Sequence, residues 1–178
     1  MTSSVVTGPD RDDSVLVAIY VDLTKNPGPE GFVRVDEYVV CRPSGEGQWQ
    51  SAGKRTLTRA EGGEVDKRCI IGVCASAPER PFSATVSFVR APGSPPGTPH
   101  SPFADPNPRE YPALKSTHTM TAPDGKPGYF YPILAAGSPG LAGEQFLHGG
   151  NYFYTVHLKD MATNQVFVCD PEMEIWPL

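Results

Sequence analysis

The chain has 178 residues, a net charge of −5, 39% apolar residues and 20% charged residues. This composition fits one globular domain that spans residues 1–178. The negative balance argues against a nucleic-acid partner, because phosphate binding requires a concentrated positive field. No apolar run approaches the ~20 residues that cross a membrane, so we also expect no membrane partner.

The sequence contains 18 glycines and 20 prolines, which favours a fold with many turns and few helices. Residues 1–13 are polar and acidic and are expected to be flexible. Because they lack a basic head and an apolar middle, they do not resemble a secretory signal. We therefore expect a cytoplasmic protein, with export by a non-classical route left open. The cysteines should then be reduced and buried; they are Cys41, Cys69, Cys74 and Cys169.

Taken in chain order, the first predicted strand covers residues 14–22, where apolar side chains point to both faces. Such a strand should be central, or covered on both sides. Residues 32–41 predict a second strand with valines on one face. Residues 54–59 could form a short, basic edge strand, since charges discourage pairing between sheets. A further strand is predicted over 67–75, before a proline-containing turn.

Residues 82–90 alternate between apolar and polar side chains, which indicates a strand with one face exposed to water. Residues 91–128 are rich in proline and can be neither helix nor central strand. We expect a long excursion here, fixed to the body by Phe103 and Tyr111. A short strand could form near residues 115–120.

The last third of the chain resumes β character at residues 128–135. The best of several poor helix candidates lies at 141–146. Residues 151–159 give the clearest strand, and 165–169 pair back on it through a hairpin-length connection. With about eight to ten strands and at most one short helix, the prediction is an all-β fold. It is an antiparallel β-sandwich of jelly-roll-like type with one long proline-rich loop.

Three segments of the C-terminal half carry a family resemblance. An aromatic strand at 129–134 precedes a tyrosine-rich strand at 151–160, which ends in Asp, and residues 166–175 contain an Asp-Pro pair. Their order resembles the PixA/AidA family of inclusion-body proteins. The opening strand at 15–22 and the segment 66–88 are similar to the same family.

The chain also departs from that family. Val166, Phe167 and Cys169 stand where the family usually carries Gly-Tyr-Phe and Trp, and the proline-rich stretch is longer. The resemblance implies a bacterial, non-enzymatic protein that accumulates and self-associates, sometimes as crystalline inclusions. In AidA-type members it also implies expression under quorum-sensing control. It carries over no functional residues.

No residue pattern indicates a catalysed reaction, a metal site or a cofactor site. We interpret the histidines as structural or surface residues; they are His100, His118, His148 and His157. There is no Gly-x-Ser-x-Gly nucleophile motif, and the cysteines lie in apolar strands, where a thiol is normally inert. Three loop carboxylates could bind calcium but are more often turn formers; they are Asp105, Asp124 and Asp160. We expect no catalytic residue, no metal and no cofactor.

The aromatic residues are numerous for a small domain, and alternation sends half of each strand's cluster to each sheet face. The outward half could lie under the long loop, face a second subunit or stack on a sugar. The candidate ligand-binding residues are Trp49, Tyr131 and Trp176. The first hypothesis is therefore a self-associating, non-catalytic protein. The alternative is a lectin-like, carbohydrate-binding β-sandwich.

Overall fold

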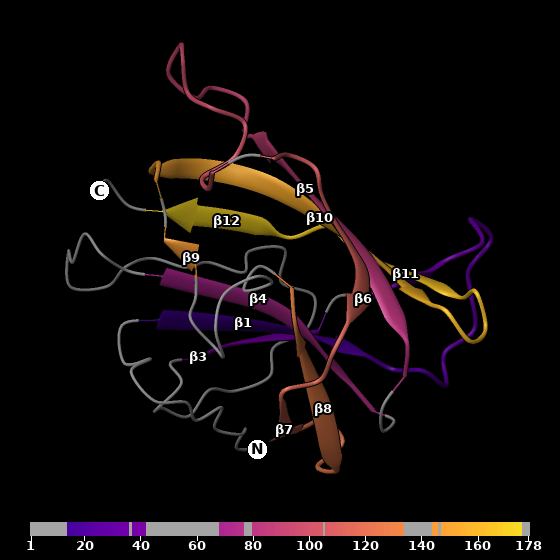
Figure 1. Ribbon diagram of the computed structural model, residues 1–178. Coiled ribbons are helices and arrows are strands. Elements are labelled where there is room, and N and C mark those ends of the chain that lie inside the picture. The colour runs from indigo at the N-terminus through magenta and orange to yellow at the C-terminus, as the bar shows by residue number, and fades with distance from the viewer. Residues whose placement is uncertain are drawn as a thin grey trace.

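The computed structural model describes residues 14–35, 37–41, 68–76, 80–104, 106–133, 144–145 and 147–175, which form two β-sheets around a shared core (Figure 1). The strands in these residues are β1 (Ser14–Val21), β2 (Val33–Arg34), β3 (Tyr38–Cys41), β4 (Arg68–Ala75), β5 (Phe82–Arg90), β6 (Arg109–Leu114), β7 (His118–Thr121), β8 (Pro127–Pro132), β9 (Glu144–Gln145), β10 (Gly150–Asp160), β11 (Val166–Cys169) and β12 (Glu172–Ile175).

The first sheet has the strand order β3-β1-β4-β8-β7, with β9 paired to β4. The second has the order β2-β11-β10-β5-β6, with β12 paired to β10. The all-β prediction is confirmed. The expectation of antiparallel pairing is wrong for two pairs, because β1–β4 and β2–β11 are parallel. Both pairs join strands far apart in the sequence, which leaves room for the long connection that parallel pairing requires. The jelly-roll-like topology stays a prediction.

The core lies between β5 and β10 on one side and β1, β4 and β8 on the other. Along β5 every second side chain from Phe82 to Phe88 is buried, and along β10 the same holds from Tyr152 to Asp160. Phe88 stacks on Tyr154 with ring centroids 5.5 Å apart. The intervening side chains face away from the core, so the predicted alternation of both strands is confirmed.

Strand β1 is apolar on both faces because both faces are buried. Val17, Ile19 and Val21 belong to the core between the sheets. Ala18 and Tyr20 belong to a second apolar cluster on the other face of the same sheet. The prediction of a doubly covered central strand is confirmed, since β1 lies between β3 and β4.

The single strand predicted over residues 32–41 is wrong, because the segment is divided between the two sheets. β2 pairs with β11 in one sheet, and β3 pairs with β1 in the other. The Val35 amide still bonds the Val168 carbonyl at 2.9 Å, whereas the Glu37 carbonyl accepts the Tyr20 amide at 2.9 Å. The chain thus changes sheets over residues 35–37. Alternating valines fit one strand or two, so the sequence pattern could not show the change.

The proline-rich excursion supplies edge strands. β6 ends the order of one sheet and β7 ends that of the other, so the proline run contains neither helix nor central strand before β8 begins. Phe103 is buried in the core against Phe88, and Tyr111 packs half-buried against the core, so both anchors predicted from the sequence are confirmed.

Residues 144–145 form strand β9, which contradicts the predicted helix at that point. The rest of that helix candidate, the flexible segment 1–13 and the predicted strand at 54–59 lie outside the described residues. In the part of the chain that the structure describes, no helix is long and apolar enough to cross a membrane.

Candidate functional site

Two adjoining hollows lie where β5 ends and β10 begins. The larger, of about 480 Å³, is formed by the turns at residues 91–98 and by Gly149, Gly150 and Asn151. The smaller, of about 160 Å³, is lined by Asn151, Phe153 and Glu172 among others. Because Ala91 and Asn151 line both hollows, we treat them together as the Asn151 groove. The larger hollow falls in the ~300–1,000 Å³ range of small-molecule sites.

The loop wall of the groove is a repeated turn whose cause is visible in the sequence. Residues 91–94 and 95–98 both have Pro-Gly at their centre, and Gly93 and Gly97 both adopt φ 85°. Proline followed by glycine is the preferred pair for a turn that needs a positive φ at its third position. Each turn is closed by a backbone hydrogen bond, from Ser94 to Ala91 and from Thr98 to Pro95.

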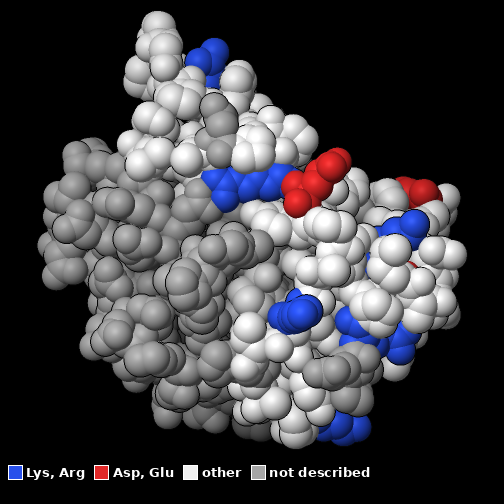
Figure 2. Space-filling view, viewed as in Figure 1, with Lys and Arg blue, Asp and Glu red and all other residues white. Residues whose placement is uncertain are grey.

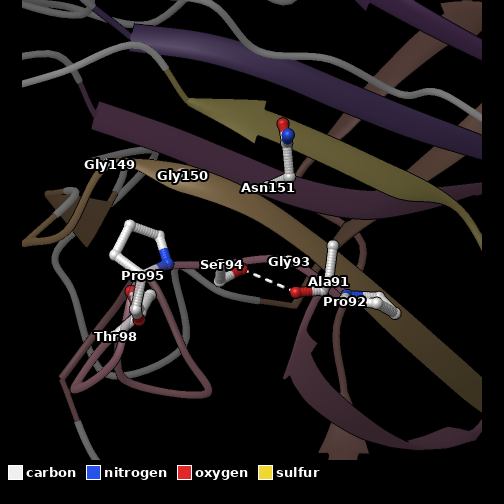
Figure 3. Close-up of a pocket in the computed structure, with 9 residues that line it drawn as sticks. All are labelled: Ala91, Pro92, Gly93, Ser94, Pro95, Thr98, Gly149, Gly150 and Asn151. Atoms are coloured by element: carbon white, nitrogen blue, oxygen red, sulfur yellow. Dashed lines mark hydrogen bonds between the residues drawn. The ribbon is translucent and has the colours of Figure 1, made fainter.

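Side-chain hydrogen bonds reinforce both turns. The Ser94 hydroxyl donates to the Ala91 carbonyl at 2.6 Å, as the dashed line in Figure 3 shows, and the Thr98 hydroxyl donates to the Pro95 carbonyl at 2.7 Å. The Arg90 guanidinium donates to the Thr98 carbonyl at 2.7 Å, which ties the second turn to the end of β5. The loop wall is therefore a braced structure that presents hydroxyl and carbonyl oxygens.

The strand wall of the groove contains an exposed aromatic residue among polar ones. Phe153 is 39% exposed on the outer face of its sheet, where its neighbours across the strands are Val89 on β5 and Glu172 on β12. Asn151 lies two residues earlier on the same face, and its side chain points away from Pro95 and Thr98 (Figure 3). A flat apolar ring thus lies between an amide and a carboxylate, both of which form directional hydrogen bonds.

Of the ligand-binding residues predicted from the sequence, Tyr131 lies in the described part of the chain. Tyr131 is 1% exposed, its ring meets Phe82 edge-on at 5.0 Å, and its hydroxyl accepts the Arg80 amide at 3.0 Å. Its ring is therefore part of the core rather than a surface platform, although it borders a separate cavity beside Arg80. Trp49 and Trp176 lie outside the described residues.

Sequence reasoning missed Asn151, Ser94, Thr98 and Glu172, which come from three separate segments. Phe153 is the residue of the groove whose exposed position the sequence pattern could have predicted. It alternates with Tyr152 and Tyr154, and filling the core with those two tyrosines leaves it on the outer face.

The polar residues weighed as catalytic or metal-binding candidates form no cluster among the described side chains. Among the described side chains, no three of the types His, Cys, Asp and Glu come together as a metal site. His100 and His157 are exposed and His148 is half-buried, while the side chain of His118 is not described. Asp124 accepts the Lys126 amide in an exposed turn at 2.9 Å, as a turn former does. Asp105 lies outside the described residues.

Asp160 is a buried structural carboxylate rather than a loop ligand. Its Oδ2 accepts hydrogen bonds from the Nε and Nη2 atoms of Arg80, and its Oδ1 accepts the Ala162 amide at 2.9 Å. Burial alone would raise the pKa of Asp160, but these hydrogen bonds and the Arg80 charge outweigh it and lower the pKa below its usual value. Asp160 therefore stays ionised and fixes the turn after β10.

The described thiols are protected. Cys74 and Cys169 are buried thiols that form no disulfide, as expected for these two residues. Burial, together with a smaller contribution from the Asp124 charge, raises the pKa of the Cys74 thiol to about 12. A thiol held in its neutral form is a poor nucleophile. The side chains of Cys41 and Cys69 lie outside the described part.

No family model, no curated protein and no solved structure matches the chain. The resemblance to the PixA/AidA proteins therefore stays a prediction.

Proposed function

We propose that this chain is a carbohydrate-binding β-sandwich whose ligand lies in the Asn151 groove. The observation that supports this most is the exposed Phe153 ring, which lies between Glu172 and Val89 and next to Asn151 along the strand. Sugars present an apolar face of C–H groups and a rim of hydroxyls. The Phe153 ring suits the face, and the Asn151 amide and Glu172 carboxylate suit the hydroxyls.

The loop wall supports the same ligand class. Oxygens of Ser94 and Thr98 keep acceptor capacity after donating to the backbone, so they can receive hydrogen bonds from further hydroxyls. Among the described residues that line the two hollows none is basic, which favours a neutral ligand over a phosphorylated one.

A glycan array probed with the full chain tests the proposal, followed by titration with the saccharide that it retains. Phe153→Ala should weaken binding at least ~10-fold, because the apolar contact is lost, and Glu172→Gln should weaken it by a smaller factor. Met161→Ala is the matched control, since Met161 is 47% exposed but lies beyond the other end of β10. An array without hits, or hits that survive Phe153→Ala and Asn151→Ala unchanged, would reject the proposal.

Self-association is the second candidate, and the pair formed by Val89 and Phe153 favours it. These are cross-strand neighbours on one sheet face, 52% and 39% exposed respectively. Adjacent exposed apolar side chains are a common feature of subunit contacts. The resemblance to inclusion-body proteins implies the same behaviour. We place this non-catalytic protein in the cytoplasm, which the buried thiols of Cys74 and Cys169 support.

Sedimentation over a range of concentrations separates the two candidates. Val89→Thr keeps a β-branched residue but removes apolar surface, so it should weaken an assembly while it leaves saccharide binding intact. Asn151→Ala should do the reverse. A sedimenting species that stays monomeric at every concentration would reject self-association.

A further inference from the structure

A second hollow lies at the opposite end of β5 from the Asn151 groove. It has a volume of about 540 Å³, and the described residues that line it are Arg80, Pro81, Leu114, Lys115, Ser116 and Tyr131. We call it the Arg80 cavity. Since the nine residues of β5 separate the two sites at ~3.3 Å per residue, they are about 30 Å apart along the strand. They are therefore separate sites.

The topology explains why polar groups gather here. Pro81 precedes β5, and Leu114 ends β6 in the same sheet. Lys115 and Ser116 belong to the connection that carries the chain from β6 to β7 in the other sheet, where β8 contributes Tyr131. The cavity thus lies where the chain passes between the sheets, and both sheets contribute to its wall.

The position of Arg80 is fixed from two sides. Its backbone amide donates to the Tyr131 hydroxyl at 3.0 Å, and its Nε donates to the buried Asp160 at 3.0 Å. These bonds hold the guanidinium through its Nε and Nη2 edge. Among the described residues, none accepts a hydrogen bond from Nη1. The side chain is 29% exposed and lines the cavity.

The other polar groups of the cavity are also donors. Lys115 is exposed and Ser116 is half-buried, and in the described part of the chain neither makes an ion pair or side-chain hydrogen bond. Among the described residues that line the cavity, none carries a carboxylate. Figure 2 shows blue side chains over the lower part of β6 and near the start of β5, with the red ones on that face lying farther up and to the side. Because Arg80 is paired with Asp160, Lys115 supplies the net positive charge of the described lining.

Leu114 and Pro81 provide an apolar wall beside these donors. An arginine and a lysine beside an apolar surface suit a planar anion that carries a hydrocarbon portion. We propose that the Arg80 cavity binds a small organic carboxylate. The carboxylate lies between Arg80 Nη1, Lys115 and the Ser116 hydroxyl, and the hydrocarbon portion packs on Leu114 and Pro81.

Benzoate is a suitable probe, with benzamide as its uncharged analogue and inorganic phosphate as the second anion. In a titration followed by amide chemical shifts, benzoate should produce saturable changes at Arg80, Lys115 and Ser116, and benzamide should produce none there. Lys115→Gln should weaken benzoate binding about 10-fold, because a charge-assisted hydrogen bond is lost. Lys126→Gln removes the same charge from the exposed turn before β8 and should leave the affinity unchanged.

Three results with benzoate, benzamide and the lysine variants would overturn the proposal. They are no saturable shift with benzoate in the millimolar range, equal binding of benzamide, and equal weakening by the two lysine variants. Phosphate that binds more tightly than benzoate would also overturn it, since the cavity would then recognise charge without the apolar portion. None of these results bears on saccharide binding, which occurs at the other end of β5.

Discussion

Gly72 on β4 lies directly against the ring of Phe130 on β8. A Cβ built on Gly72 would meet Phe130 Cζ at 2.5 Å and the Tyr131 carbonyl oxygen at 2.6 Å. The glycine therefore lets two neighbouring strands bring a large aromatic side chain over the backbone, in the apolar cluster that covers the outer face of the first sheet.

Gly72→Ala should consequently destabilise the protein by about 2 kcal/mol or more, because neither the ring nor the backbone oxygen can move freely. Urea denaturation measures the loss. Adding Phe130→Leu should recover part of it, since the shorter side chain vacates the contested space. An unchanged midpoint for Gly72→Ala would mean that the strands separate at no cost.

The side chain of Asn107 takes the place of a strand beside Phe88. Its Oδ1 accepts the Phe88 amide at 2.9 Å, and its Nδ2 donates to the Phe88 carbonyl at 2.9 Å. Asn107→Ala should cost about 1–3 kcal/mol, because both backbone groups lose their partner. It should also speed hydrogen exchange at the Phe88 amide. Asn151→Ala, at an exposed position, serves as the control and should leave both quantities unchanged.

The ion pairs Arg80–Asp160 and Arg34–Asp170 differ in burial, which predicts different contributions to stability. Asp160 is 2% exposed, whereas Arg34 and Asp170 are 58% and 48% exposed. Asp160→Asn should cost about 2 kcal/mol, because it leaves a guanidinium beside a buried neutral group. Asp170→Asn should cost less than ~0.5 kcal/mol. Denaturation of the two variants side by side measures the difference, and equal losses would contradict it.

Alkaline pH should unfold the protein through the second apolar cluster. Burial raises the pKa of Cys74 from 9.0 to about 12, and burial likewise raises the pKa of Tyr20 from 10.0 to about 12. Because the folded state favours the protonated form, stability is complete below about pH 9 and falls as the pH rises toward 12.

Urea midpoints measured between pH 8 and pH 11 should therefore decline, and Cys74→Ala should flatten the decline by removing one of the two groups. If the urea midpoints of the wild-type protein and the variant declined equally with pH, Cys74 would not be responsible for the decline.

The sequence predicted the fold best for strands in which all side chains of one face share the same environment. The alternation in β5 and β10 predicts which side chains enter the core, and the two-sided apolar character of β1 predicts its central place. Parallel pairing of β1 with β4 could not be predicted, because the pattern of a strand does not identify its neighbour.

The candidate site was less accessible to prediction than the fold. Ser94, Asn151 and Glu172 are polar residues in unremarkable local contexts, and only folding brings them to one place. Tyr131 belonged to an aromatic cluster that pointed to a ligand surface. Its ring is buried because its face of β8 belongs to the core between the sheets.

The passage of the chain through residues 35–37 ties the two layers together. Val35 is hydrogen-bonded to one sheet and Glu37 to the other. The two residues are so close in the sequence that the sheets cannot separate while both remain folded. Thermal unfolding should accordingly occur in one step, without a populated intermediate in which only one sheet is folded. A ligand that stiffens either layer would in turn protect the other.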